Sequence, residues 1–175
     1  TRKLLVDRLV LNELRAKVDS GNGRLALTTR IAGGGGHATV NVKTGLDWGA
    51  RLVPVPDQQL EGSFTAQSFP LATLQPLVEG SISELEGKLD ADIRAELEAG
   101  QPKLSGQATL KDGVLHLPTV GQRFSAIGAK VTISPTSLKV ENIKARGLSG
   151  GFEAQAEAVL RGLTPVSANA TLKID

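Results

Sequence analysis

Hydrophobic and polar residues alternate along most of this chain with the two-residue period of a β-strand. Every second residue from Leu14 to Val18 is apolar, and the residues between them are charged. The Asn22-Gly23 pair that follows is a strong signal for a two-residue hairpin turn, because both residues tolerate a positive φ. Such a turn places Val18 opposite Leu27 and Leu14 opposite Ile31. The pattern therefore predicts a hairpin with one apolar and one polar face.

The same alternation recurs further along the chain and predicts a meander of antiparallel strands. Asp112-Gly113 predicts a second tight hairpin, with Leu110 opposite Leu115. Pro135-Thr136 as a loop pairs Ile133 with Leu138. The apolar parity slips near Glu141-Asn142, which indicates a β-bulge.

One segment predicts a short helix. Phe69 to Leu77 carries apolar residues at helical spacing, with Ser68 as the expected N-cap and Pro70 in the first turn. Pro76 keeps this helix short. We expect it to cover an edge or an end of the sheet, because so short a helix is not stable alone.

The stretch from residue 81 to 99 has two interpretations. Leu85, Leu89 and Ile93 fit one face of a helix at a spacing of four residues. The same stretch also alternates strictly between apolar or small residues and charged residues, as a strand does. The internal Gly87 and the surrounding meander favour a strand.

These elements predict one β-rich domain: a β-meander over 1–45, a loop over 46–59, a strand and the short helix over 60–80, and a second β-meander over 81–175. The expected fold class is all-β with one short helix, an antiparallel meander rolled into a taco- or half-pipe-like sheet with an aliphatic interior. The sequence leaves open whether the sheet is an open trough or a closed sandwich. Because the pattern starts and stops inside strands, we expect a fragment of a longer protein.

Composition narrows the class of protein. Of the 175 residues, 40% are hydrophobic and 22% charged, which is typical of a globular domain and not of a disordered chain. Only 3% are aromatic, so small and aliphatic side chains must supply the apolar face. A net charge of +2 with interleaved signs predicts no nucleic-acid surface. The absence of cysteine excludes thiolate chemistry and disulfides.

No arrangement of residues predicts an enzyme, a cofactor or a metal site. The acidic residues between Glu84 and Glu98 alternate along a strand and are interrupted by basic residues, which is typical of a solvated face. The Gly33 to Gly36 run lacks the lysine of a phosphate-binding loop, so we interpret it as a turn. His37 and His116 are distant in sequence and have no evident carboxylate partner. We interpret Trp48, in a loop, as a hydrophobic plug.

The residues from Leu104 to Ile133 resemble the TamB family (translocation and assembly module) of the AsmA-like superfamily. They read L-x-G-x-x-x-L-x-x-G-x-x-x-L-P, followed by G-x-x-F-x-x-I-x-x-x-V. The stretch A-x-G-x-x-G-G-F-x-A at 145–154 and the stretch F-P-L-A-x-L-x-P-L at 69–77 are similar to this family too. The resemblance covers roughly residues 60 to 160, and its motifs consist of turn glycines and aliphatic residues.

The resemblance implies a periplasmic protein of Gram-negative bacteria, anchored in the inner membrane and reaching the outer membrane. It implies a rolled sheet with an apolar lining, and a role in phospholipid transport between the membranes and in outer-membrane biogenesis. The implied partners are phospholipid acyl chains, an outer-membrane barrel-assembly protein of the TamA or BamA type, and unfolded outer-membrane protein clients.

Two functions follow as expectations, together with a weaker third. In the first, the apolar face forms a groove for lipid acyl chains, since many of its positions are alanine and leave space beside an aliphatic wall. In the second, the chain is a non-enzymatic docking or scaffold module for assembly or secretion of outer-membrane proteins, whose open sheet edge pairs with a partner strand. The third, a carbohydrate-binding sandwich, lacks an exposed aromatic platform. The expected groove-lining residues are Leu14, Ala16, Val18, Leu25, Leu27, Ile31, Val40, Val42, Phe64, Leu85, Leu89, Ile93, Leu104, Ala108, Leu110, Leu115, Ile127, Val131, Ile133, Leu138, Val140, Phe152, Ala154 and Ala156.

Overall fold

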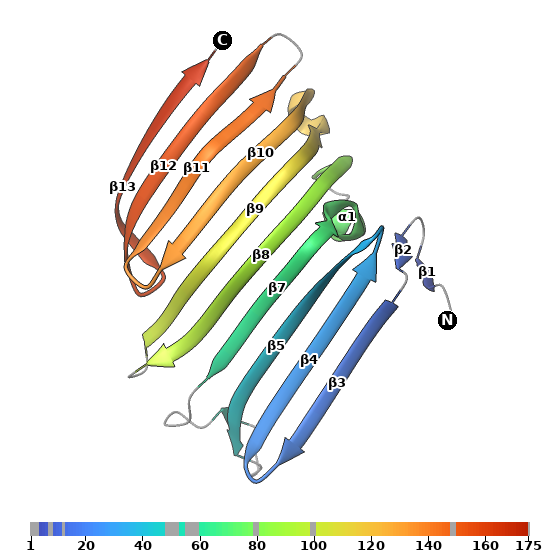
Figure 1. The fold of residues 1–175 in the computed structure, drawn as a ribbon, viewed down its shortest axis with the longest axis vertical. Coiled ribbons are helices and arrows are strands. Elements are labelled where there is room, and N and C mark those ends of the chain that lie inside the picture. The colour runs from blue at the N-terminus through green and yellow to red at the C-terminus, as the bar shows by residue number, and fades with distance from the viewer. Residues whose placement is uncertain are drawn as a thin grey trace.

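One long antiparallel sheet makes up most of the structure, a computed structural model (Figure 1). The expected all-β fold class is confirmed: the sheet is an open, half-pipe-like meander that does not close on itself. The structure describes residues 4–6, 9–11, 13–47, 53–54, 60–78, 81–98, 101–147 and 150–174.

The strands of the main sheet lie side by side in the order β13-β12-β11-β10-β9-β8-β7-β5-β4-β3, so each neighbour in the sequence is also a neighbour in space. The short strand β6 (Val53–Pro54) pairs with β5, and β1 (Leu4–Val6) pairs with β2 (Leu9–Leu11) in a separate ladder. The bounds of the main strands are β3 Glu13–Gly21, β4 Arg24–Gly33, β5 Gly36–Asp47, β7 Glu61–Pro70, β8 Glu84–Glu98, β9 Gln101–Leu117, β10 Gln122–Ser134, β11 Ser137–Arg146, β12 Gly151–Arg161 and β13 Thr164–Ile174.

The first predicted hairpin is confirmed in its register. Val18 lies opposite Leu27 and Leu14 opposite Ile31. Asn22 and Gly23 both have a positive φ, 51° and 71°, as a tight turn between twisted strands requires. Local turn chemistry and the apolar pattern agree here, so the register was readable from the sequence.

The predicted hairpin at Asp112-Gly113 is wrong. Strand β9 runs without a turn through these residues, and Leu110 pairs with Leu89 of β8 and Ala129 of β10 instead of Leu115. Asp112 does have the positive φ that the motif favours, at 52°. Here the positive φ belongs to a β-bulge inside a long strand. Strands β8 and β10 pair with β9 both before and after Asp112, so the chain does not turn there.

The predicted helix begins later than expected. Ser68 is not an N-cap: it lies in β7 with a φ of 44°, and its N–H donates to Asp90 Oδ1 at 2.8 Å. A 3-10 turn, η1 (Leu71–Leu74), starts after the extended Pro70 and continues into α1 (Gln75–Val78). The ambiguous stretch at 81–99 contains β8, so the interpretation as a strand is confirmed.

The loop expected over 46–59 is partly strand. Strand β5 continues to Asp47, and Leu46 and Asp47 pair with Pro54 and Val53 of β6. Trp48 lies outside the described residues.

Five adjacent strands, β7 to β11, each contain a residue with positive φ next to a shift in register. Each such bulge adds a residue to one strand and increases the local twist and bend. The five bulges lie in neighbouring strands of the sheet. The residues and their φ values are Ser68 (44°), Gly87 (126°), Asp112 (52°), Ala126 (50°) and Asn142 (54°).

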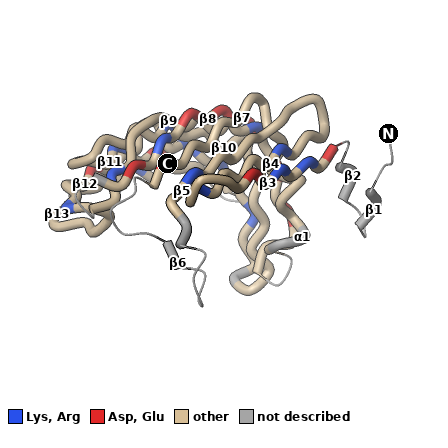
Figure 2. Tube along the Cα trace, turned by 90° about the horizontal axis from the view of Figure 1, so that it is seen from below, with Lys and Arg blue, Asp and Glu red and all other residues tan. Residues whose placement is uncertain are grey.

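The sheet is one layer thick (Figure 2). Among the described residues, the buried apolar side chains are those of Ala38, Ala66, Phe69 and Ala145. The chain exposes 11847 Å² of surface, whereas a compact protein of 18.3 kDa exposes roughly 8,000 Å². The open arrangement therefore replaces the closed sandwich that the sequence left possible.

Candidate functional site

An unbroken row of apolar side chains crosses all strands of the main sheet. Residues paired across an antiparallel ladder project from the same face of a sheet, so the row can be followed from partner to partner. It contains no polar residue, and alanine fills most of its positions. From β3 to β13 the row consists of Leu14, Ile31, Ala38, Ala66, Ala91, Ala108, Val131, Val140, Ala156 and Ala170.

A second row on this face runs beside the first. Thr29 is its one polar member, and Phe64 and Ile93 are its largest side chains at the centre of the sheet. These two side chains are larger than the alanines at the centre of the first row. The second row consists of Ala16, Thr29, Val40, Phe64, Ile93, Gly106, Ile133, Leu138, Ala158 and Ala168.

The remaining residues that the sequence placed in the groove also project from this face, which we call the apolar face. Phe152 lies edge-on to Phe124, with ring centroids 6.0 Å apart. Ile127 lies beside Leu110, over Gly113. The other members, by their ladder partners, are Val18, Leu25, Leu27, Val42, Leu85, Leu89, Leu104, Leu115 and Ala154.

None of the predicted lining residues is buried. Leu14 and Val18, at the β3 edge, expose 55% and 62% of their surface. The others are half-buried by their neighbours in the sheet, apart from Ala16 and Val40, which are exposed. The apolar face is therefore open to whatever lies against it.

The η1–α1 segment covers one part of the apolar face. Leu74 packs on a small core formed by Ala38, Ala66 and Phe69. Gln75 fixes the segment to the sheet, since its Oε1 accepts the N–H of Leu85 at 2.6 Å. The sequence predicted a helical cover but not this side-chain tether, because a glutamine carries no signal of which distant N–H it will meet.

The opposite face of the sheet, the polar face, carries the charges. Its matching row across the strands contains residues of both signs between neutral polar ones, consisting of Arg15, Arg30, Thr39, Thr65, Asp92, Gln107, Thr132, Lys139, Glu157 and Asn169. At the ladder-paired positions that the structure describes, no charged residue projects from the apolar face.

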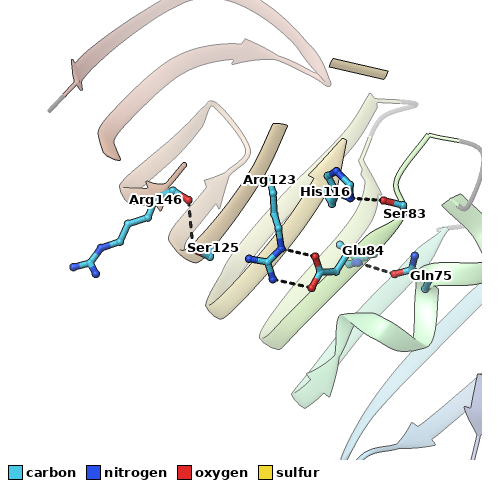
Figure 3. Close-up of polar contacts among 8 residues, drawn as sticks. Gln75, Ser83, Glu84, His116, Arg123, Ser125 and Arg146 are labelled. Carbon is cyan, nitrogen blue, oxygen red and sulfur yellow. Dashed lines mark hydrogen bonds and ion pairs between the residues drawn. The ribbon is translucent and has the colours of Figure 1, made fainter. Parts of the chain in front are cut away.

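A polar cluster joins β8, β9 and β10 on the polar face (Figure 3). Arg123 donates two hydrogen bonds to the Glu84 carboxylate, at 2.7 and 2.8 Å. These hydrogen bonds hold the pKa of Glu84 below its ordinary value. His116 lies between these residues in the ladder and shares a 2.7 Å hydrogen bond with Ser83. The histidine thus has polar neighbours that the sequence did not reveal.

Other ion pairs of this face lower carboxyl pKa values in the same way. The backbone N–H of Ser68 and then Lys111 lower the pKa of Asp90. Lys139 lowers the pKa of Glu141, and Lys144 that of Glu153. Asp90 and Glu141 are half-buried, whereas Lys111, Lys139 and Glu153 are exposed. These pairs favour one arrangement of the polar face.

The described part of the chain has no group of three or more histidine and acidic residues placed to hold a metal ion. Its helices are also too short or too polar to cross a membrane. A hollow of about 360 Å³ on the polar face is open to solvent, and Thr28, Asn41, Ser63 and Arg94 contribute to its lining. Thr28 and Ser63 hydrogen bond to Asn41 there, at 2.9 and 3.2 Å, so these polar groups are already partnered.

Comparisons with protein-family models, curated proteins and solved structures find no match to this chain. The geometry of the two faces is therefore the basis for a function.

Proposed function

We propose that this chain is a periplasmic module of a TamB-like protein, whose apolar face accommodates lipid acyl chains during phospholipid transport from the inner to the outer membrane. The observation that supports it is the unbroken, uncharged row of apolar residues across every strand of the main sheet. Water is a poor solvent for such a surface, and an acyl chain needs no hydrogen-bonding partner. The proposed role is non-enzymatic and needs no cofactor.

The dimensions of the apolar face suit this ligand. Neighbouring strands are about 4.8 Å apart, so the row from β3 to β13 spans roughly 43 Å. One acyl chain spans about half of the roughly 30 Å hydrocarbon core of a bilayer. Burying a 16-carbon chain is worth roughly 12 kcal/mol gross, at about 0.8 kcal/mol per methylene. The row is thus long enough for successive acyl chains to lie end to end.

A pair of adjacent substitutions tests the proposal. Val131→Glu places a carboxylate in the apolar row, between Ala108 and Val140. Thr132→Glu introduces the same charge one residue later on the polar face, opposite Lys139. We expect Val131→Glu to reduce binding of a fluorescent fatty acid at least ten-fold, because the carboxylate must lose water beneath the chain. Thr132→Glu should bind like the wild type.

Phospholipid that co-purifies without added detergent, identified by mass spectrometry, gives a second measure. Circular dichroism of both variants would confirm that the sheet is intact. Equal binding by the two variants, or no binding by the wild type, would contradict the proposed lipid role.

A docking or scaffold role is the second candidate, and the open edges of the sheet favour it. Among the described strands of the main sheet, β3 and β13 each have one neighbour, so the outer backbone donors and acceptors of both have no ladder partner there. A strand of a barrel-assembly protein of the TamA or BamA type would pair there. In that case Val131→Glu, which lies in the interior strand β10, would leave binding to the barrel protein unchanged while lipid binding is lost or absent.

A further inference from the structure

The η1–α1 segment lies over part of the apolar row that crosses all strands of the main sheet (Figure 2). This row passes through Ala38 of β5 and Ala66 of β7, which expose only 5% and 4% of their surface. Leu74 packs against the small core that contains both alanines. Ala108, two strands further along the row, is half-buried. One part of the row is therefore covered by the chain itself.

The start of this cover is fixed to the sheet through its backbone. The N–H of Ser68 donates to Asp90 Oδ1 at 2.8 Å. Two glycines at the connection of β4 and β5 pack against the same place. A Cβ at Gly36 would overlap the carbonyl oxygen of Ser68. A Cβ at Gly34 would lie 3.1 Å from Pro70 Cγ. The glycine run thus lets the end of β7, from which the cover departs, lie close to the turn.

Side chains hold the rest of the cover on the sheet. Leu74 supplies apolar contact, and Gln75 Oε1 accepts the N–H of Leu85 in β8 at 2.6 Å. Gln75 Nε2 also donates to the carbonyl oxygen of Ile82, at 3.4 Å. So short a helical segment is not stable alone, so these contacts determine how firmly it stays in place.

We propose that η1–α1 is a displaceable cover, and that an acyl chain takes the place of Leu74 over Ala38 and Ala66 when the cover lifts. This role of the cover rests on the proposed lipid role of the apolar face. Apolar burial changes little in the exchange, because methylenes of the ligand replace the leucine side chain on the same alanines. An acyl chain has no group that replaces the hydrogen bond of Gln75. That hydrogen bond is therefore the contact that favours the closed state.

The closed cover and an acyl chain at this place exclude each other, so each shifts the equilibrium of the other. Loosening the cover should strengthen acyl binding over Ala38 and Ala66. Acyl binding should in turn release the Gln75 tether. A segment that only stabilises the sheet would show neither effect.

Two variants of Gln75 and a photo-reactive ligand test this coupling. Palmitate that carries a diazirine is cross-linked to the protein by light, and the adducts are mapped by mass spectrometry. In the wild type we expect adducts around Ala108 and few at Ala38 and Ala66. Gln75→Ala should raise the yield at Ala38 and Ala66, relative to that at Ala108, at least about three-fold, because loss of the tether populates the open state. Gln75→Glu keeps an oxygen acceptor and should give the wild-type pattern.

Hydrogen exchange of the Leu85 amide is the reciprocal measurement. Palmitate should accelerate this exchange in the wild type at least about three-fold, since the amide loses its acceptor when the cover lifts. Circular dichroism checks that the variants keep the sheet.

The outcomes separate the cover from the lipid role. Adducts around Ala108 with an unchanged yield at Ala38 and Ala66 in Gln75→Ala would overturn the displaceable cover and leave the lipid role standing. Exchange of the Leu85 amide that palmitate does not accelerate would overturn it as well. If palmitate labels no part of the apolar face in any variant, the lipid role fails, and the function of the cover fails with it.

Discussion

Four residues other than glycine hold a left-handed backbone conformation at the bulges of the sheet. Asp112 and Asn142 tolerate it well, because their short polar side chains suit positive φ. Ser68 and Ala126 are less suited to it. The fifth bulge residue, Gly87, has a φ of 126°, which side chains rarely adopt. The bulges of the sheet therefore depend on individual residues in adjacent strands.

Gly87→Ala should destabilise the protein. An added Cβ would lie 2.9 Å from the Cα of Gly113, and the φ of 126° strains any residue with a side chain. We expect a loss of about 1–3 kcal/mol in the free energy of unfolding, measured by urea denaturation. Gly21→Ala is the control, because a Cβ there meets no atom within 4 Å. Equal stability of the two variants would show that the bulge carries no strain.

At the scale of elements, the η1–α1 segment covers part of the apolar face and leaves the rest exposed to solvent. The η1–α1 segment is too short to fold alone, and its position depends on Leu74 packing and on the Gln75 tether. Pro70, extended with a ψ of 120°, ends the strand and begins the return over the sheet.

Gln75→Ala should loosen this cover. The N–H of Leu85 would lose its acceptor at 2.6 Å, which costs roughly 1–2 kcal/mol for a part-buried group. Hydrogen exchange of the Leu85 amide should accelerate at least ten-fold. Gln75→Glu keeps an oxygen acceptor at this place and should exchange almost as slowly as the wild type. Fast exchange in both variants, or in neither, would refute the tether.

At the scale of the whole molecule, the charged residues of the sheet lie on its polar face. Ion pairs connect neighbouring strands across it, among them Lys111 with Asp90 at 3.3 Å and Lys144 with Glu153 at 2.7 Å. Exposed pairs of this kind contribute little each. They do, however, link the stability of the sheet to pH.

The protein should lose stability in acid partly through Glu84. Its pKa in the folded protein is below the ordinary value of 4.5, because Arg123 hydrogen bonds to its charged form. As pH falls, Glu84 therefore takes up a proton in the unfolded chain before it does so in the folded protein. The contribution of this pair to the stability of the fold is complete above pH 4.5 and is lost as pH falls through the pKa of Glu84 in the folded protein. Glu84→Gln should show a shallower decline in melting temperature over that range.

Arg123→Gln is the matched variant for this effect, since it removes the other partner of the hydrogen bonds. Arg123→Gln should reduce the decline in melting temperature at low pH by the same amount as Glu84→Gln. The double variant should reduce this decline no further. An unchanged pH profile in Glu84→Gln would show that the pair is not coupled to folding.

The sequence alone determined the two faces of this protein. Because side chains alternate across a strand, each apolar residue in the alternating stretches was assigned to one face, and the predicted lining residues do share it. The Asn22-Gly23 turn and the bulge at Asn142 were also readable, since turn and bulge residues have local φ preferences.

The tertiary structure decided which structural element each local φ preference produces. Asp112 adopts positive φ as predicted, yet pairing with β8 and β10 makes it a bulge in a long strand and not a turn. The same ladders decide that the sheet stays open and that Leu74 returns onto Ala38 and Ala66. A residue's own chemistry sets its conformation and its face, whereas the strands that pair beside it set how far the sheet extends and what covers it.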